Sequence, residues 1–171
     1  MNNVELKART TDLNKAREVC EELSAEFMWR RNQRDIYFAT TPDRRLKLRI
    51  EDNESPYLVR YSRPDKTGGR DCTYSILTIH RTCHAESVEF FTGALEVKGE
   101  VEKTRELFVW ENVRIHLDRV KGLGEFIEFE HPVGEHGKEQ ADMRIQMLCE
   151  RFSINTPDTV PGSYVDLLEL E

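Results

Sequence analysis

Charged side chains recur at every second position in several short segments of the chain. An extended strand turns alternate side chains to opposite faces, so such residues share one face. In residues 45–50, Arg45, Lys47 and Arg49 alternate with apolar residues, and in residues 126–130 Glu128 and Glu130 do the same. A face with surplus Lys and Arg suits a polyanion. A small group of carboxylates beside it suits a divalent cation that bridges to that polyanion.

The same alternation covers two further segments. Residues 3–9 and 113–118 each carry three polar side chains on one face, namely Glu5, Lys7 and Arg9, and then Arg114, His116 and Asp118. If the sheet closes with these faces inward, so much buried charge is costly unless it is paired or binds something. If the sheet stays open, the same face is solvated. The alternation alone leaves both arrangements open.

Most of the remaining chain reads as strand, with turn sequences between the segments. Further strands are expected at residues 35–39, 57–63, 72–80, 96–102 and 103–110. Helical periodicity predicts helices at residues 13–27, 85–95 and 138–152, the first capped by Asp12. About eight antiparallel strands in one domain indicate a sandwich or a barrel.

Composition narrows the class of protein. The 171 residues are 38% apolar and 33% charged, which fits one globular domain. The net charge of −7 argues against a nucleic-acid partner. No apolar run is long enough for a membrane helix, and the first residues show no signal-peptide core. We therefore expect a cytoplasmic protein with neither a nucleic acid nor a membrane as partner.

The cysteines and their neighbours favour no metal or redox motif. No two of the four cysteines have CxxC spacing, so free thiols in or near the core are expected. His80, Cys83 and His84 lie close together in sequence. Their context favours the end of a strand entering a helix over a metal site.

Several motifs, in order along the chain, carry a resemblance to a known family. The segment NVELKAR (residues 3–9) resembles the ExExK signature of the CYTH superfamily, also called triphosphate tunnel metalloenzymes. The segments QRDIYF (33–38), RLKLR (45–49), YSRPD (61–65), KTR (103–105), RIHLD (114–118) and GLGEFIEFE (122–130) resemble later strands of that family. The tail PGSYVDLL (161–168) is similar to the class IV adenylyl-cyclase-like branch.

This resemblance implies an α+β fold: an eight-stranded antiparallel β-barrel that forms a triphosphate tunnel, with helices packed outside. A single CYTH-like domain would span residues 1–171. A triphosphate group would bind inside the tunnel together with Mg²⁺ or Mn²⁺.

The resemblance also implies roles for individual residues. The metal candidates, which would also be catalytic, are Glu5, Asp118, Glu128 and Glu130. Basic residues would bind phosphate oxygens, since guanidinium groups pair with them bidentately and Lys supplies a point charge. These candidates are Lys7, Lys47, Arg49, Arg63, Lys103, Arg105 and Arg114, with Lys7 also counted as catalytic.

Some of these assignments have an alternative. Arg63 could be a solvated turn residue, and Arg9 could simply pair with a carboxylate. His116 could bind substrate or assist proton transfer, or it could be a hydrogen-bonded structural residue. The alternation does not settle where Arg45 and Arg60 point.

One position departs from the signature. Asn3 stands where the motif has its first Glu. A neutral amide removes one negative charge, so a second metal would be held more weakly and a strict two-metal mechanism is in doubt.

The implied activity is conversion of ATP to cyclic AMP and pyrophosphate by a class IV adenylyl-cyclase-like enzyme. The alternatives are hydrolysis of inorganic triphosphate or thiamine triphosphate, and a non-catalytic polyphosphate- or nucleotide-binding module. A homodimer is compatible with the sequence.

Overall fold

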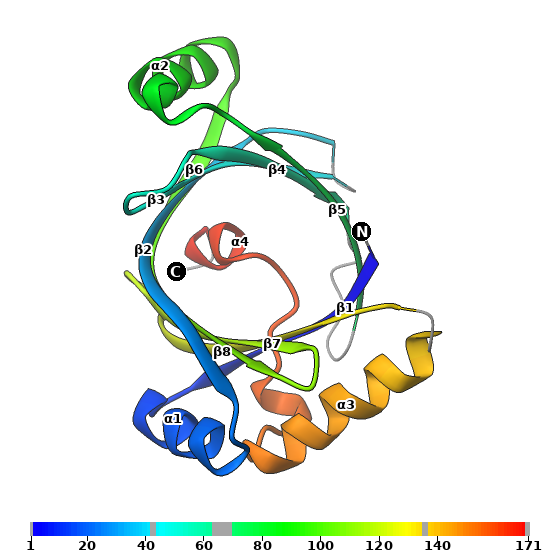
Figure 1. The fold of residues 1–171 in the computed structure, drawn as a ribbon. Coiled ribbons are helices and arrows are strands. Elements are labelled where there is room, and N and C mark those ends of the chain that lie inside the picture. The colour runs from blue at the N-terminus through cyan, green and yellow to red at the C-terminus, as the bar shows by residue number, and fades with distance from the viewer. Residues whose placement is uncertain (1, 42–43, 63–69, 135–136, 170–171) are drawn as a thin grey trace.

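The chain folds into a closed barrel of antiparallel strands, as the sequence predicts (Figure 1). The structure is a computed structural model that describes residues 2–41, 44–62, 70–134 and 137–169. Around the barrel the strands follow the order β1-β5-β4-β3-β2-β6-β7-β8, and β8 pairs with β1 to close the ring. Arg63 lies outside the described residues.

Eight strands form the barrel of the described chain. They are β1 (Asn2–Thr10), β2 (Glu26–Phe38), β3 (Arg45–Glu51), β4 (Tyr57–Ser62), β5 (Arg70–Thr78), β6 (Val97–Trp110), β7 (Val113–Val120) and β8 (Gly124–Pro132). The helices are α1 (Leu13–Glu22), α2 (His84–Ala94), α3 (Gly137–Arg151) and α4 (Tyr164–Leu168), with 3-10 turns at Arg81–Cys83 and Thr156–Asp158. No helix in the described ranges has the length and apolar character needed to cross a membrane.

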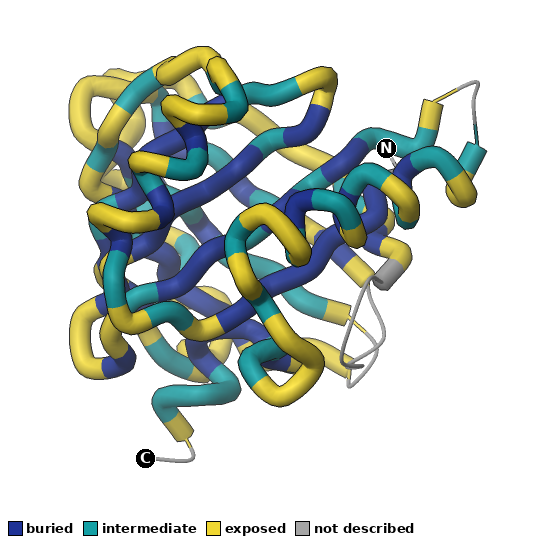
Figure 2. Tube along the Cα trace, turned by 90° about the horizontal axis from the view of Figure 1, so that it is seen from below, coloured by how far each residue is buried: buried dark blue, intermediate teal, exposed yellow. Residues whose placement is uncertain are grey.

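The outward faces of β1, β7 and β8 are apolar and are covered by α1 and α3. Ile115 and Phe129 of the sheet pack with Ile145 and Leu148 of α3 in one cluster, and all four are at most 2% exposed. Buried residues follow the strands, and exposed ones lie mainly at the loops (Figure 2). Because this outer face is filled with apolar side chains, the alternating polar residues must point into the barrel.

The predicted helix over residues 13–27 ends earlier than expected. Asp12 caps α1 by accepting hydrogen bonds from the backbone of Asn14 and Lys15, as predicted. The helix then stops because Ser24 adopts a left-handed conformation, with φ of 55°. The chain enters β2 at Glu26, so Phe27 packs edge-on against Phe108 of β6 and is not on a helix face. The strand expected at 35–39 therefore begins nine residues earlier.

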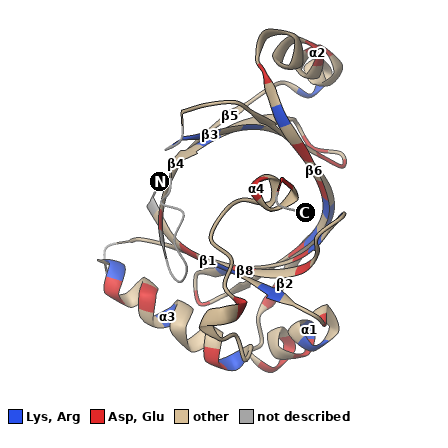
Figure 3. Cartoon of the chain, turned by 180° about the vertical axis from the view of Figure 1, so that it is seen from behind, with Lys and Arg blue, Asp and Glu red and all other residues tan. Residues whose placement is uncertain are grey.

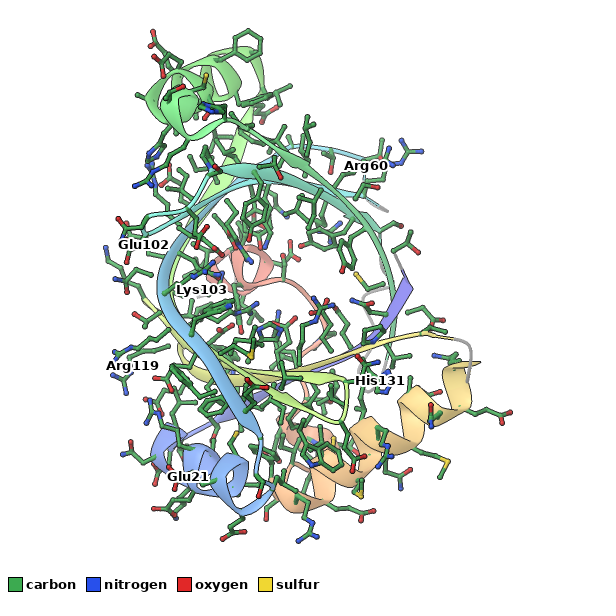
Figure 4. All side chains as sticks on the ribbon, viewed as in Figure 1. Glu21, Arg60, Glu102, Lys103, Arg119 and His131 are labelled. Carbon is green, nitrogen blue, oxygen red and sulfur yellow. The ribbon has the colours of Figure 1, made fainter. Side chains whose placement is uncertain are left out.

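The two strands expected at 96–102 and 103–110 are one continuous strand, β6. Alternation runs unbroken through Glu102 and Lys103, whose side chains point to opposite sides of the wall (Figure 4). Strand β6 pairs with β2 along one edge and with β7 along the other. This strand links the two sides of the barrel.

Helix α4 lies within the ring of strands in the end-on view, whereas α1, α2 and α3 pack outside it (Figure 1). Tyr164 and Val165 of α4 are buried in a cluster with Tyr37, Val101 and Phe126. The short helix therefore closes one end of the barrel interior, an arrangement that the expectation of helices packed outside does not include.

The cysteines match the expectation only in part. All four are free: Cys20 and Cys72 are buried and Cys149 is partly buried, but Cys83 is exposed on the 3-10 turn. His80 caps this turn, where strand β5 gives way to α2, and no metal-binding group of three His, Cys, Asp or Glu side chains occurs in the described ranges.

We expect that Gly99→Ala loosens α4. A Cβ atom at Gly99 would lie 2.8 Å from Cγ2 of Val165, so the Val165 side chain or the α4 backbone that carries it must shift away from β6. We predict a free energy of unfolding lower by about 1–3 kcal/mol, measured by urea denaturation, and faster amide exchange in α4. Gly93→Ala in α2 is the control, because nothing lies within 4 Å of its added Cβ. Equal losses in the two variants would contradict this role of Gly99.

Candidate active site

The barrel encloses a cavity of about 450 Å³, and its lining includes Ser163 and Tyr164 at the start of α4. Charged residues of both signs lie around the ring of strands (Figure 3). Among the described residues, the cavity is lined by seven basic and five acidic side chains. The basic ones are Lys7, Arg31, Lys47, Arg49, Lys103, Arg105 and Arg114, and the acidic ones are Glu5, Glu51, Glu54, Glu128 and Glu130.

Most of the predicted site residues therefore meet in one place. Ten of them line this cavity: Glu5, Lys7, Lys47, Arg49, Lys103, Arg105, Arg114, His116, Glu128 and Glu130. The two other candidates are Arg63, outside the described residues, and Asp118, which is fully buried. The inward-facing arrangement of the polar strand faces is thus the correct one of the two that alternation allows.

The cations of one wall converge on Asp35, which is completely buried. Its carboxylate accepts hydrogen bonds from Lys47 Nζ at 2.9 Å and from Lys103 Nζ at 2.8 Å. It also accepts hydrogen bonds from Nε and Nη2 of Arg49, at 2.6 and 2.7 Å. Strand register produces this convergence, since Asp35 of β2 lies opposite Arg49 of β3 and next to β6. One negative charge meets three positive ones, so this wall retains positive charge for an anion.

The pKa directions follow from this crowding. Burial alone would raise the pKa of Asp35, but the charges of Arg49, Lys103 and Lys47 outweigh it and hold that pKa well below its usual range. Burial, reinforced by the charge of Arg49, lowers the pKa of Lys47 and of Lys103, and Asp35 opposes this. A bound anion would relieve the repulsion among these cations.

Asp118, on the same inward face of β7 as Arg114 and His116, holds Arg105 in place. Its carboxylate accepts a hydrogen bond from Nε of Arg105 at 2.6 Å and another from the hydroxyl of Tyr164 at 2.7 Å. Arg105 also donates to Glu128 at 2.9 Å. In this arrangement Asp118 orients Arg105 and Tyr164, and its role as a metal ligand remains a prediction.

The remaining acidic candidates, Glu5, Glu128 and Glu130, form the opposite wall. Glu5 of β1 lies directly across from Glu130 of β8, and Glu128 is two residues along β8, so the three face the cavity from adjacent strands. Glu130 contacts Arg114 Nε at 3.2 Å and His116 Nε2 at 3.4 Å. Burial would raise the pKa of Glu130, but His116 and Arg114 lower it, so the group is a carboxylate at neutral pH.

These three carboxylates suit a divalent cation by their chemistry, because hard cations take oxygen ligands. In the described part of the chain they do not form a ready-made metal cluster, and Glu128 and Glu130 are instead paired with Arg105, Arg114 and His116. A cation would have to exchange with these partners. The donor set therefore fits Mg²⁺ or Mn²⁺ together with a phosphate group that occupies the released basic side chains.

Asn3 has a specific partner in the folded protein. Its side chain is 1% exposed, and Nδ2 donates to Glu130 Oε1 at 2.7 Å. The amide thus orients a candidate metal ligand at the position where the family motif supplies a further carboxylate. A Glu at this position would repel Glu130 unless a cation lay between them.

His116 is buried among charges and has one ring nitrogen in use. Burial and the charge of Arg105 lower its pKa, which keeps the imidazole neutral at physiological pH. Nε2 faces Glu130, while the buried Nδ1 has no hydrogen-bond partner among the described residues. A neutral imidazole with an unused nitrogen on a cavity wall can accept a proton or bind substrate.

Sequence reasoning did not assign a role to Asp35 or to Tyr164. Asp35 shares the alternating face of β2 with Gln33 and Tyr37, so its inward direction could have been found from the spacing. Tyr164 comes from a five-residue helix with no periodic signal. Its ring lies 4.0 Å from Lys7 Nζ, which places it at the cavity floor. Of the neighbouring residues, Arg60 is exposed and points outward, whereas Arg45 pairs with Asp166 at the α4 end (Figure 4).

Comparison with known proteins matches residues 1–164 to the CYTH domain family. The chain is 27% identical, over 98% of both chains, to a Methanocaldococcus jannaschii protein named "Putative adenylate cyclase". The fold is similar to that of the PH1012 protein from Pyrococcus horikoshii, with a TM-score of 0.84, 23% identity, and coverage of 96% of this chain and 98% of that one. It is also similar to that of HpAC1 from Hippeastrum, with a TM-score of 0.67, 16% identity, and coverage of 99% and 95%. HpAC1 is described as having a dominant triphosphatase activity.

Replacing Asp35 by Asn should destabilise the fold strongly. The change leaves Lys47, Arg49 and Lys103 without the charge that holds them, so we predict a loss of about 3–5 kcal/mol in the free energy of unfolding at pH 7, measured with urea. Asp71→Asn is the control, because the Asp71–Lys138 pair is exposed and its loss should cost about 1 kcal/mol or less. Similar losses in both variants would show that the Asp35 carboxylate does not organise this wall.

The same residue should shape the pH dependence of stability. The folded pKa of Asp35 is lower than its unfolded value of about 3.9, so ionised Asp35 stabilises the fold above that pH. This contribution is lost as the pH falls below about 4 toward the folded pKa. Urea denaturation between pH 7 and pH 3 should therefore show a smaller drop for Asp35→Asn than for the wild type.

Tyr164→Phe should remove one donor from a buried carboxylate while keeping the ring. Burial and the charge of Asp118 raise the pKa of Tyr164, so its hydroxyl is protonated and donates. We predict a loss of about 1–3 kcal/mol in the free energy of unfolding. Tyr164→Leu, which also removes the contact with the Phe126 ring, should lose more. A Phe variant as stable as the wild type would mean that Arg105 alone satisfies Asp118.

Proposed function

We propose that this chain, which belongs to the CYTH domain family, is an enzyme. It would bind a triphosphate-bearing small molecule in the barrel with the help of Mg²⁺ or Mn²⁺. The activity that we favour is conversion of ATP to cyclic AMP and pyrophosphate. The resemblance of the tail to the class IV adenylyl-cyclase-like branch and the name of the Methanocaldococcus jannaschii relative support this choice.

The observation that carries the proposal is the separation of charge across the cavity. Lys47, Arg49 and Lys103 surround a single carboxylate on one wall, while Glu5, Glu128 and Glu130 face the cavity from the other. A triphosphate offers several anionic oxygens to the basic wall, where Arg binds bidentately and Lys as a point charge.

Glu5, Glu128 and Glu130 would hold the cation. A bound divalent cation would neutralise phosphate charge and make a coordinated hydroxyl easier to deprotonate. Glu128 and Glu130 are paired with Arg105 and Arg114, and if the two glutamates held the cation, these arginines would be available to the phosphates. The chain would then exchange internal ion pairs for substrate contacts without leaving buried charge unpaired.

In the cyclase reaction, the ribose 3′-oxygen forms a bond to the α-phosphorus, and the bond from that phosphorus to the α–β bridging oxygen breaks. Pyrophosphate leaves with the bonding electrons, and the 3′-hydroxyl proton passes to a base. We assign that base to His116, whose Nδ1 is unpartnered among the described residues and whose lowered pKa keeps it neutral. Arg105 and Lys103 would stabilise the charge that develops on the phosphates.

A triphosphatase is the second candidate. The observation that favours it is the similar fold of HpAC1 from Hippeastrum, which is described as having a dominant triphosphatase activity. In that reaction water attacks the terminal phosphorus, and the same basic wall and carboxylates serve. The two activities differ in whether the enzyme holds a sugar hydroxyl in line with the α-phosphorus.

Product analysis should decide between them. We expect purified protein with ATP and Mg²⁺ or Mn²⁺ to form cyclic AMP and pyrophosphate, and chelator to abolish turnover. The double variant Glu128→Gln, Glu130→Gln should lose at least about 100-fold in rate while remaining folded. Glu102→Gln, on the outer side of β6 and paired with Lys121, should keep its rate (Figure 4).

Other outcomes would redirect the assignment. Phosphate release from ATP, inorganic triphosphate or thiamine triphosphate without cyclic AMP would identify a triphosphatase. Tight binding without product under any metal would indicate a binding module. Unchanged turnover in the double variant would contradict the role given to these carboxylates.

A further inference from the structure

The cavity changes character along its length. On β2, Tyr37 belongs to the buried cluster that includes Tyr164 at the α4 end, and Asp35 follows in the charged centre. Trp29 lies eight residues from Tyr37, or about 26 Å at the rise of a strand, and also lines the cavity. Trp29, Tyr57, Ile76 and other apolar side chains therefore line the end that lies away from α4.

This end has little positive charge to offer a phosphate. Arg31 is its local cation, and it is paired with Glu51 at 3.0 Å and with Glu54 at 2.6 Å. Two carboxylates on one guanidinium leave a net negative charge, opposite to the surplus of cations around Asp35. An inorganic triphosphate would use the centre and leave this apolar end unexplained.

The aromatic side chains here are held in fixed positions. The guanidinium of Arg31 lies 4.6 Å from the centre of the Trp29 ring. The hydroxyl of Tyr57 donates to Glu51 at 3.0 Å, so Glu51 anchors both Arg31 and Tyr57. Rings fixed in this way can stack on or flank a planar group at little cost in side-chain entropy.

Between the aromatic end and the charged centre lies an unused acceptor. Gln33 is 3% exposed and lines the cavity. Its Nε2 donates to Glu51, while Oε1 has no hydrogen-bond partner among the described residues. A buried unsatisfied carbonyl is unfavourable, so a ligand hydroxyl that donates to it would be bound selectively.

We propose that Trp29, Tyr57 and Gln33 form a nucleoside subsite: the aromatic residues take a planar base, and Gln33 Oε1 accepts the ribose 2′-hydroxyl. The inference rests on the proposed function, since it places the triphosphate on the Asp35 wall. It narrows the substrate class to ribonucleoside triphosphates and disfavours inorganic triphosphate. The order along β2, from Trp29 through Gln33 to Asp35, matches the order base, sugar, phosphates.

Calorimetry with two ligands tests this assignment. We would titrate wild type, Trp29→Leu and Trp29→Phe with Mg²⁺ and either inorganic triphosphate or an ATP analogue whose α–β bridging oxygen is a methylene group. Trp29→Leu should weaken binding of the analogue by about tenfold or more, as loss of base stacking does, and Trp29→Phe should restore most of it. Neither change should alter the affinity for inorganic triphosphate by more than about twofold.

Gln33 has a matched chemical control. Gln33→Leu should weaken binding of the ribose analogue by about fivefold or more, but should leave binding of its 2′-deoxy counterpart unchanged. Trp110→Phe provides a background with a single tryptophan. The chain has two tryptophans, Trp110 packs against the outer core, and its replacement leaves Trp29 as the remaining one. In that background, the analogue should quench Trp29 fluorescence and inorganic triphosphate should not.

The outcomes separate this inference from the proposed function. If inorganic triphosphate binds the wild type, but Trp29→Leu and Gln33→Leu bind the analogue as the wild type does, the nucleoside subsite is wrong and the triphosphate site stands. If neither ligand binds the wild type, the proposed function itself fails. Circular dichroism of each variant distinguishes loss of binding from loss of fold.

Discussion

The charge balance around Asp35 is the constraint on which the interior of this barrel depends. Three cations from β3 and β6 share one carboxylate from β2, so these three adjacent strands are joined by side-chain ion pairs as well as by their backbone hydrogen bonds. Each partner would be costly to bury alone. Together they remain short of negative charge, and that shortage makes the interior a site for an anion.

The outer packing makes this interior possible. Apolar faces of β1, β7 and β8 are covered by α1 and α3, so the alternating polar faces are turned inward by exclusion from the core. Helix α4 then closes one end, where Tyr164 supports the Asp118–Arg105 pair. Asp118 thereby acts on the cavity through Arg105, and Arg105 presents its charge to the cavity in a fixed orientation.

Along the cavity, the polar groups are graded. One end is lined by apolar and aromatic side chains and by Arg31, which is paired with Glu51 and Glu54. The cation-rich centre follows. The glutamates of β1 and β8 lie across from that centre, with Asn3 orienting Glu130. Such a gradient suits an amphiphilic anion with a planar end better than a simple polyphosphate.

How much of this could be predicted differs from residue to residue. The period of two in residues such as Lys47, Arg49, Glu128 and Glu130 determined which side chains share a face, because the geometry of a strand depends only on local spacing. The resemblance to the family motifs added the predictions that the strands close into a barrel and that the barrel binds a triphosphate. Neither could show that Asp35 collects Lys47, Arg49 and Lys103, or that Tyr164 reaches Asp118. Those contacts join residues up to 68 positions apart, and they depend on strand register, barrel closure and the docking of a helix too short to leave a periodic signal. The sequence by itself therefore determined the faces of the strands, and the tertiary structure decided which residues on those faces meet.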